Sequence, residues 1–511
     1  MASPTPRHWA DKCADLLLAE RGNGPFLIAS GISPSGKIHV GNLREVLTAD
    51  IIHRVLSERG VQSRLIFVAD DYDPLRKVYP FLDAAVYAKH IGAPLSAIPC
   101  PCGGHKSYAQ HFLEPFFASL RTLKIAAEPV LASELYASGA LLEQTLIALK
   151  QRDAIAEILN RVTGKEIEPG WSPFMALCSS CGSMARTAVT GWSETDRTIT
   201  YTCATCAIEK TAPIVGAGKL TWRVDWPARW AALRVGIEPF GKDHGGKGGS
   251  YDTGKEIVAK LFDWQAPFPV IYEWIRLKGL GDMSSSKGNV VSVDEVLDVI
   301  PPDVLRYFIT RPEPKASLAL DPVAQMLNLV DEVDDETKKQ RDARSVELSQ
   351  AGGFVPIGIP FNHLINVWQV AQGSLDTAKT ILARTGYHWS SDDALAQRCR
   401  YAANWLERFA PDEYKFSLAQ TLPESAKQFD AAQKKLAALV ADRLAALPKA
   451  AAEDIHRVLY EVATENGIGM GDLCRLFYQA LIGKDRGPRA GWFAEIIGVD
   501  FVCTRLREAA A

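Results

Sequence analysis

The sequence predicts an α/β domain built on a parallel sheet, followed by an all-α domain. Two observations carry this prediction. Short apolar runs at residues 26–30 and 64–69 flank a glycine-containing turn and a segment, 43–58, whose apolar residues recur at helical spacing. Strand, turn, helix and strand in this order form one βαβ unit of a parallel sheet. From about residue 325 the chain becomes rich in Ala, Leu, Lys, Arg and Glu, a composition that favours helices.

Length and composition narrow the class of protein. A chain of 511 residues is too long for one hydrophobic core and is expected to form two or three domains. No run reaches the roughly 18 apolar residues of a membrane span, and the N-terminus lacks an apolar signal core, so we expect a cytoplasmic protein. The formal charge of -3 argues against a generally basic coat for nucleic acid but leaves room for a local basic stripe.

The remaining elements are expected in chain order. They are helices at 107–124 and 136–163, a small cysteine-rich β module at 171–215, a strand at 220–224, a helix at 250–262 and a strand at 268–272. Prolines at 301, 302, 312 and 314 then mark a boundary, after which the composition becomes rich in helix-forming residues. We therefore expect a first domain at 1–320, which includes the 171–215 insertion, and a helical domain at 321–511.

The first motif with chemical meaning follows the strand at 26–30. Residues 34–42 read P-S-G-K-I-H-V-G-N. A strand that ends at glycines and opens a helix presents backbone N–H groups and the positive end of the helix dipole, which suit a phosphate. Gly31 and Asp70 fall at the carboxyl ends of the two predicted strands, where ligands of parallel sheets bind.

The second motif, at 283–289, reads M-S-S-S-K-G-N. A Gly/Ser loop that carries a lysine is able to close over the same phosphates, although such a loop taken alone is more often a linker. The order of the two motifs favours the phosphate interpretation over the linker.

Four of the ten cysteines form two C-x-x-C pairs, Cys178/Cys181 and Cys203/Cys206. Two such pairs predict a closed structural zinc site with four thiolate ligands. A further run, Cys100-Pro101-Cys102-Gly103-Gly104-His105, could supply metal ligands too, but it offers only three candidates close together.

Together the two motifs resemble the ATP-handling signatures of class I aminoacyl-tRNA synthetases. With the runs at 29–45, 70–77, 239–244 and 249–254, the chain resembles class I lysyl-tRNA synthetases in particular. The resemblance implies a Rossmann-like catalytic core, a zinc-ribbon insertion and a helical anticodon-binding domain. It also implies ATP-dependent ligation of L-lysine to tRNA(Lys) through a lysyl-adenylate, with Mg2+ accompanying ATP and a structural Zn2+.

The resemblance places site residues on both motifs. The catalytic residues are expected to be His39, Asn42 and Lys287. The expected ATP-binding residues are Pro34, Gly36, Lys37, His39, Gly41, Asn42, Met283, Ser284, Ser285, Ser286 and Lys287. Two positions depart from the family pattern: Asn42 stands where many members carry a second histidine, and Ser285 occupies the usual lysine position. We therefore expect Lys287 to supply the positive charge that closes over the ATP phosphates, with Lys278 as a weaker candidate.

A pocket for an ε-ammonium needs acidic or aromatic partners. The expected amino-acid-binding residues are Gly31, Ser33, Asp70, Trp222, Asp243, His244 and Tyr272. Glu45 and Asp225 are further acidic candidates near predicted strand ends. Each has a structural alternative: a tryptophan such as Trp222 in an apolar strand is equally compatible with core packing, and Asp225 or Asp243 is equally compatible with capping the helix that follows.

Other interpretations remain open from the residues alone. One is a class I synthetase for another amino acid such as cysteine or glutamate, and another is a zinc-ribbon RNA-binding regulatory protein that retains a nucleotide fold. A cysteine enzyme would use zinc as a substrate ligand, which four thiolates argue against, and intact His39 and Lys287 argue against an inactive fold.

In the helical domain, basic and aromatic residues are the expected contacts to the anticodon arm: Arg408, Lys415, Arg475, Phe477 and Arg489.

Overall fold

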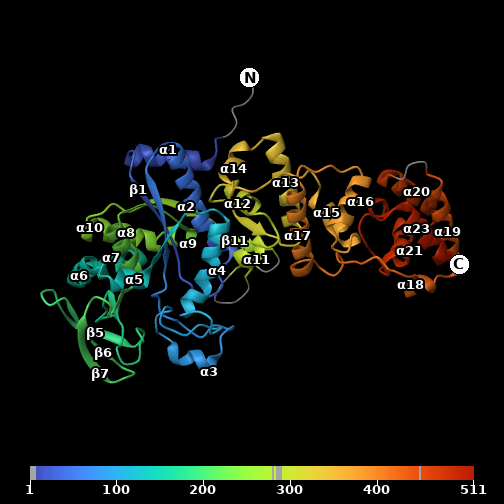
Figure 1. Ribbon diagram of the computed structural model, residues 1–511. Helices are drawn as coiled ribbons and strands as arrows, with labels where there is room; N and C mark the ends of the chain where they lie inside the picture. Colours follow the sequence, from blue (N-terminus) through green and yellow to red (C-terminus); the bar gives the residue numbers. More distant parts are fainter. Residues whose placement is uncertain (1–6, 279–280, 284–289, 448–450) are drawn as a thin grey trace. The chain divides into compact units, whose positions relative to one another are not determined.

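A five-stranded parallel sheet organises the first part of the chain (Figure 1). Its order is β10 (Phe268–Tyr272), β9 (Val235–Gly241), β1 (Phe26–Ile32), β2 (Ser63–Ala69) and β3 (Glu128–Leu131). The chain runs from β1 outward through β2 to β3 on one side, and from β9 to β10 on the other. The strand order therefore reverses between β1 and β9, which is where an open parallel sheet forms a ligand-binding crevice.

The computed structural model describes residues 7–278, 281–283, 290–447 and 451–511. These residues fall into two compact units. The first comprises Met1–Leu297, Leu305–Leu320 and Arg344–Gly352, and the second comprises Asp298–Val304, Asp321–Ala343 and Gly353–Ala511. Within the described residues, no helix combines the length and the apolarity that crossing a membrane requires.

Helices connect and cover the strands. Along the chain up to residue 310 they are α1 (Trp9–Arg21), α2 (Val40–Glu58), α3 (Ala84–Tyr87), η1 (Ala88–His90), α4 (Tyr108–Thr122), α5 (Ala132–Ala137), α6 (Leu142–Lys150), α7 (Arg152–Thr163), α8 (Trp222–Leu233), α9 (Lys242–Gly245), α10 (Ser250–Leu261), α11 (Val293–Leu297) and α12 (Pro302–Thr310). A second, three-stranded sheet joins β12 (Gly281–Asp282), β11 (Ile275–Leu277) and β13 (Leu318–Leu320). The predicted parallel-sheet α/β domain is confirmed.

Two of the predicted elements differ from the structure. The segment 136–163 is not one helix, because Gly139 with φ +78° and the turn at Gln151 divide it, so that α6 and α7 are separate. The predicted strand at 220–224 is also wrong beyond Leu220, where β8 (Gly218–Leu220) ends. The carbonyl of Thr221 accepts the N–H groups of Val224 and Asp225, each at 2.8 Å, and so begins α8.

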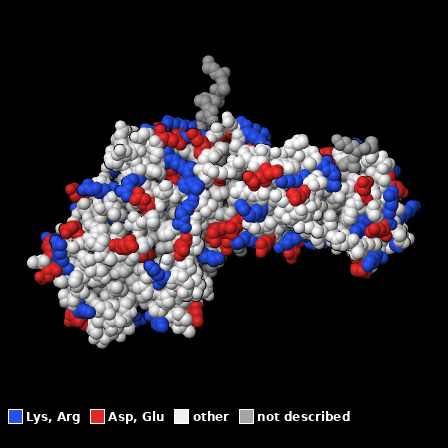
Figure 2. Space-filling view, in the orientation of Figure 1, with Lys and Arg blue, Asp and Glu red and all other residues white. Residues whose placement is uncertain are grey.

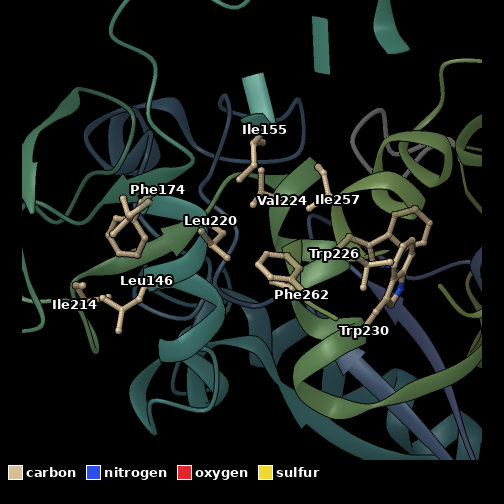
Figure 3. Close-up of a cluster of buried hydrophobic side chains, with 14 of the residues drawn as sticks. Leu146, Ile155, Phe174, Ile214, Leu220, Val224, Trp226, Trp230, Ile257 and Phe262 are labelled. Carbon is tan, nitrogen blue, oxygen red and sulfur yellow. The ribbon is translucent and has the colours of Figure 1, made fainter. Parts of the chain in front are cut away.

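The cysteine-rich insertion is a small β module, as predicted, and its strands pair in antiparallel fashion. It consists of β5 (Thr187–Ser193), β6 (Thr198–Cys203) and β7 (Ile208–Pro213), and β4 (Phe174–Ala176) pairs with β8 at its base. Apolar side chains continue from this base into the sheet domain, as Figure 3 shows for Phe174, Leu220 and Val224. Because fully burying such a side chain contributes roughly 1.5–3 kcal/mol, this shared core fixes the module to the sheet domain.

The second unit contains only helices among its described regular elements, which confirms the predicted all-α region. They are α13 (Gln325–Lys339), α15 (Phe361–Val370), α16 (Leu375–Arg384), α17 (Asp392–Arg408), α18 (Glu424–Lys427), α19 (Ala431–Ala445), α20 (Ala452–Glu465), α21 (Met470–Ile482), α22 (Ala490–Ile497) and α23 (Val499–Ala510).

The segment 344–352, which includes most of α14 (Ala343–Leu348), belongs to the first unit. The Arg344 guanidinium lies 3.1 Å from Asp11 and 2.6 Å from Glu58. The buried Arg306 guanidinium donates to Asp50 at 2.6 Å and to the carbonyl of Leu348 at 3.0 Å. Truncating the chain near residue 330 would therefore remove the segment 344–352 from the first unit. Point variants are for that reason better probes of the helical unit.

Candidate active site

A cavity of about 400 Å3 opens where β1, β9 and β10 end and α2 begins. It brings together these predicted residues: Gly31, Ser33, His39, Gly41, Asn42, Asp243, His244, Tyr272 and Met283. They come from four separate stretches of sequence, and the strand order β10-β9-β1 places them at one edge of the sheet. The cavity therefore occupies the crevice expected at the reversal of strand order.

His39 is the residue before α2 and points its imidazole into a buried position. Its backbone N–H donates to the side-chain oxygen of Asn42 at 3.2 Å, so Asn42 caps the helix start. The imidazole Nδ1 is buried and has no hydrogen-bond partner among the described residues. Burial lowers the pKa of His39 to about 4, so the ring is neutral at pH 7. A neutral imidazole beside a helix N-terminus is able to donate one hydrogen bond to an incoming phosphate oxygen.

Gly41 is required by the position of His39. A Cβ at Gly41 would lie 2.8 Å from the His39 ring and 3.6 Å from the methyl group of Met283. The His39 imidazole thus adjoins the space that a side chain at Gly41 would fill. A substitution at Gly41 would therefore displace His39.

Other predicted ATP-binding residues lie away from the cavity lining or outside the described residues. Pro34, Gly36 and Lys37 belong to the loop before α2, and the Lys37 Nζ lies 3.2 Å from Glu295 Oε1 in an exposed ion pair. Lys278 is exposed directly after β11. The remaining predicted residues, Ser284, Ser285, Ser286 and Lys287, lie outside the described residues.

A smaller cavity of about 50 Å3 adjoins the first and shares Gly31, Glu45 and His244 with it. Three indole rings line it, from Trp222, Trp226 and Trp230, which recur every four residues along one face of α8. The Trp222 and Trp226 rings are stacked with centroids 5.4 Å apart. Three carboxyl groups also line the small cavity: Glu45, Asp70 and Glu238.

Two of these carboxyl groups are held by uncharged donors. Glu45 accepts the N–H of Gly31 at 2.8 Å and the hydroxyl of Tyr272 at 2.7 Å. Glu238 accepts the indole N–H of Trp226 at 3.0 Å and that of Trp230 at 2.5 Å. Burial raises the pKa of Glu45 to about 8 and that of Glu238 to about 7. Neither carboxyl has a salt-bridge partner among the described residues, so both suit an incoming cation.

Asp70 differs because a buried cation already faces it. The Arg229 guanidinium lies 2.5 Å from Asp70 Oδ1 and also pairs with Asp225. Asp225 is fully buried, accepts the Tyr136 hydroxyl at 2.5 Å and lies 3.1 Å from the Lys219 ammonium. Lys219 also pairs with Asp73 at 2.5 Å, so both cations of this buried network are engaged by carboxylates. Asp225 therefore has a structural role and does not line the small cavity.

Sequence reasoning missed Glu238, Trp226 and Trp230. One signal was present, because Glu238 is a carboxylate inside an otherwise apolar strand, and a buried carboxylate needs a partner. The two tryptophans lie on α8, beyond the point where a strand had been predicted. The error in secondary structure therefore concealed their shared face.

The four cysteines of the insertion converge as predicted. The Sγ atoms of Cys178 and Cys206 are 3.9 Å apart, and those of Cys181 and Cys203 are 3.8 Å apart. All four sulfur atoms lie within 4.8 Å of one another. A tetrahedral site with Zn–S bonds of about 2.3 Å has sulfur–sulfur edges of about 3.8 Å. The geometry of this cluster therefore fits zinc.

A second cluster joins Cys100, Cys102, His105 and His111, whose ligand atoms also lie within 4.8 Å of one another. Cys100 Sγ is 3.3 Å from His105 Nδ1, and Cys102 Sγ is 3.3 Å from His111 Nδ1. The run 100–105 predicted only three of these ligands. His111 supplies the fourth from the first turns of α4, outside the short run that was considered. Two sulfur and two nitrogen donors form a further set that suits zinc.

Comparison with known proteins agrees with this geometry. The sequence model of the tRNA synthetases of class I (K) matches residues 7–352, and that of an anticodon binding domain matches residues 394–510. The lysine–tRNA ligase of Archaeoglobus fulgidus is 46% identical over 98% of this chain and 100% of its own length. Lysine–tRNA ligase 1 of Methanosarcina acetivorans is 42% identical, and the lysine–tRNA ligase of Thermoplasma volcanium is 40% identical, each over 98% of both chains. The expected family is confirmed: this chain belongs to the class I lysyl-tRNA synthetases.

Proposed function

We propose that this chain joins L-lysine to lysine tRNA in two steps that consume ATP. In the first step the lysine carboxylate attacks the α-phosphate of ATP, which gives lysyl-adenylate and releases pyrophosphate. In the second step a ribose hydroxyl at the 3′ end of the tRNA attacks the activated carbonyl, and AMP leaves. The observation that supports lysine is the small cavity with three indoles and three carboxyl groups beside the larger cavity at the start of α2.

The bound lysine is proposed to contact residues of both cavities. Glu238 lines only the small cavity and forms no salt bridge with any described residue, so we assign it to the ε-ammonium of lysine. Glu45 lines both cavities and is assigned to the α-amino group. The stacked rings of Trp222 and Trp226 provide an apolar wall for the aliphatic stem and a cation–π surface for its charge. A neutral side chain of similar length would place no cation beside the buried Glu238 carboxyl, which gives selectivity.

The larger cavity receives the phosphates of ATP. The N-terminus of α2 and the neutral His39 ring are the donors to the α-phosphate as its charge develops, the type of stabilisation that carries most of the rate in such reactions. Asn42 holds the helix start, Asp243 and Tyr272 line the larger cavity, and His244 lines both cavities. We assign the closing contacts to the 283–289 loop, with Lys287 as its cation. Mg2+ would accompany the ATP phosphates, as in other phosphoryl and nucleotidyl transfers.

We propose that the helical part of the chain binds the anticodon of the tRNA. We assign catalysis to 1–320, with which the segment 344–352 packs, and anticodon binding to the remainder of 321–511. Figure 2 shows basic and acidic side chains interspersed over the face in view, in keeping with the net charge of -3. Recognition through unstacked bases does not require a continuous basic surface and is compatible with the mixed charges of this face. The family match removes support for a cysteine or glutamate enzyme and for a regulatory protein.

We propose that the four-cysteine cluster of the insertion and the cluster of two cysteines and two histidines each hold one structural zinc ion. We expect about two zinc ions per purified chain, measured by elemental mass spectrometry. Cys178→Ser and His111→Ala should each remove about one ion and lower the thermal unfolding midpoint, because the binding energy of such sites contributes to folding. Cys474→Ser, at a half-buried cysteine outside both clusters, is the matched control. Unchanged zinc in either cluster variant would show that the residue is not a ligand.

Lysine binding is expected to strengthen as the pH rises. In the free protein, burial raises the pKa of Glu45 to about 8 and that of Glu238 to about 7, so both carboxyls carry protons to a large extent at pH 7. An ammonium placed beside them favours the ionised form, so binding releases protons. Affinity should therefore rise between about pH 6 and pH 8 and level off above. Calorimetry in two buffers of different ionisation enthalpy measures the released protons, and an uptake of protons at pH 7 would contradict the assignment.

The proposed function is tested directly by tRNA charging. The purified chain, ATP, Mg2+ and an unmodified transcript of an archaeal lysine tRNA should yield lysyl-tRNA from labelled lysine. A transcript for another amino acid serves as the control and should remain uncharged. Charging of the control at an equal rate, or no charging of either transcript, would refute the proposal.

A further inference from the structure

The segment 74–106, between β2 and α4, carries an apolar and basic surface that the proposed sites for ATP and lysine do not use. Of the seven large apolar side chains that are exposed among the described residues, three lie within residues 81–91. Four basic residues occur in the same segment against a single acidic one, Asp83. The exposed residues of this stretch form the 76–91 surface: Arg76, Lys77, Phe81, Val86, Lys89 and Ile91.

The cations of the 76–91 surface are unpaired. Arg76, Lys77 and Lys89 make no ion pair with any residue that the structure describes. Asp83 caps α3, where its side chain accepts the N–H of Ala85 at 2.8 Å. The whole chain has a net charge of -3, so this segment is basic within a slightly acidic protein. A local basic patch of this kind is expected where a protein contacts a nucleic acid.

Phe81 presents an aromatic ring to solvent from a fixed position. The side chain is 43% exposed. Its ring stacks with that of Tyr79 at a centroid distance of 5.8 Å and meets the Phe112 ring of α4 edge to face at 6.0 Å. The preceding turn is held by the N–H of Leu75, which donates to the carbonyl of Ala93 at 2.9 Å. A ring held in this way loses little freedom when a base stacks on it.

A series of contacts leads from Phe81 to the wall of the larger cavity. Phe112 meets Tyr108 with ring centroids 4.9 Å apart, and the Tyr108 hydroxyl donates to the carbonyl of Ser35 at 2.7 Å. Ser35 lines the larger cavity, while Figure 1 shows α3 at the outer margin of the first unit. A single strand whose last nucleotide occupies that cavity would therefore reach Phe81 within a few nucleotides, at roughly 3.4 Å for each stacked base.

Three of the RNA contacts predicted in the helical unit are engaged within the protein. Arg408 pairs with Asp298 at 2.6 Å. Arg475 pairs with Asp472 at 3.3 Å. Phe477 is only 1% exposed and belongs to the core of the helical unit, so its prediction as a contact is wrong. The 76–91 surface differs from these positions because it combines an exposed ring with unpaired cations.

We propose that the 76–91 surface binds the unpaired 3′ end of the tRNA and leads it to the larger cavity. The inference rests on the proposed function and deepens it, because that function requires the 3′ ribose to reach the adenylate. Phe81 stacks one unpaired base, and Arg76 and Lys77 pair with the neighbouring phosphates. An apolar protein partner would bury these cations without a counter-charge, so the chemistry favours a polyanionic single strand.

The test measures the binding of two RNAs to the full chain: a lysine tRNA transcript and the same transcript without its unpaired 3′ nucleotides. Fluorescence anisotropy gives the Kd of each. We expect the wild type to bind the intact transcript roughly tenfold more tightly than the shortened one. Phe81→Ala should bind both alike, with the affinity that the wild type has for the shortened transcript.

A second variant tests the phosphate contacts. Arg76→Ala combined with Lys77→Ala should weaken the intact transcript selectively. It should also lower the slope of log Kd against log salt by about 1.4 for that transcript, since a single strand contributes about 0.7 for each phosphate contact. An unchanged salt slope would remove Arg76 and Lys77 from the surface that binds the strand.

The matched controls are Leu16→Ala, at an exposed apolar residue of α1, and Arg121→Ala, at an exposed arginine near the other end of α4. Both should retain the tenfold difference between the transcripts, as should Phe81→Trp, which keeps a stacking face. Thermal unfolding midpoints and zinc content verify folding near the adjoining Cys and His cluster. If Phe81→Ala fails this check, Phe81→Leu replaces it, because leucine is apolar but offers no aromatic face.

The inference is overturned if the wild type binds both transcripts equally, or if folded Phe81→Ala still distinguishes them as the wild type does. Equal losses for both transcripts in that variant would also overturn it, because the ring would then act elsewhere than at the 3′ end. These outcomes concern binding alone and leave charging by the wild type intact. A wild type that charges no lysine tRNA would instead overturn the proposed function.

Discussion

Replacing Glu238 by glutamine is expected to raise the KM for lysine roughly 30- to 1,000-fold while leaving the KM for ATP nearly unchanged. The reason is that Glu238 has no salt-bridge partner among the described residues and lines the small cavity, not the larger one assigned to ATP. Losing one partner of a buried charge pair costs about 2–4 kcal/mol. Steady-state kinetics of lysine activation measures the effect, and norleucine, which lacks the ammonium, should bind the variant no worse than it binds the wild type.

Two further variants sharpen this expectation. Glu238→Asp keeps the carboxylate but, being one methylene shorter, holds it farther from the lysine ammonium. It should therefore retain more lysine affinity than Glu238→Gln. Glu157→Gln, on the exposed side of α7, is the matched control and should behave as the wild type does. A Glu238→Gln protein that folds normally and still discriminates lysine from norleucine as the wild type does would remove Glu238 from the ammonium site.

Replacing His39 by alanine is expected to lower the rate of adenylate formation about 10²- to 10³-fold, with a small change in the KM for ATP. Removing one preorganised donor to a developing charge has this magnitude. The buried and unpaired Nδ1 of His39 and its position before α2 support this role. Because the pKa of His39 is lowered to about 4, the ring stays neutral, and the rate should show no ionisation of this residue between pH 6 and pH 8.

The control for His39 is His388→Ala, at an exposed histidine of the helical unit. His39→Asn is informative as well, because asparagine retains a donor and suits the position before a helix. It should recover part of the lost rate. Equal losses in His39→Ala and His388→Ala, or an unaltered rate in His39→Ala, would exclude a catalytic role.

The parts of this site that are local in sequence could be predicted. The βαβ unit, the start of α2 at His39 and the two C-x-x-C pairs each depend on a short stretch whose pattern has one main physical meaning. Gly31 and Tyr272 lie at the ends of apolar strands, so their approach to one edge of the sheet follows from the general rule for parallel sheets.

The parts that depend on packing between distant segments could not. Glu45 on α2, Trp226 on α8 and Glu238 on β9 meet only because β9 inserts beside β1, an order that no local pattern reveals. The run from Leu220 to Val224 suggested a strand because its residues favour strands, yet tertiary packing of the Trp222, Trp226 and Trp230 face makes it helical after Leu220. His111 escaped notice because it lies on a helix, one turn away from the cysteine loop.

Pyrophosphate exchange with each of the twenty amino acids tests the central claim most directly. The purified chain is incubated with ATP, labelled pyrophosphate and one amino acid at a time, with and without lysine tRNA. The two-cavity site predicts labelled ATP with lysine far above that with any other amino acid, and loss of this signal in His39→Ala and, at low lysine, in Glu238→Gln. Robust exchange with another amino acid and none with lysine, under either condition, would contradict the account.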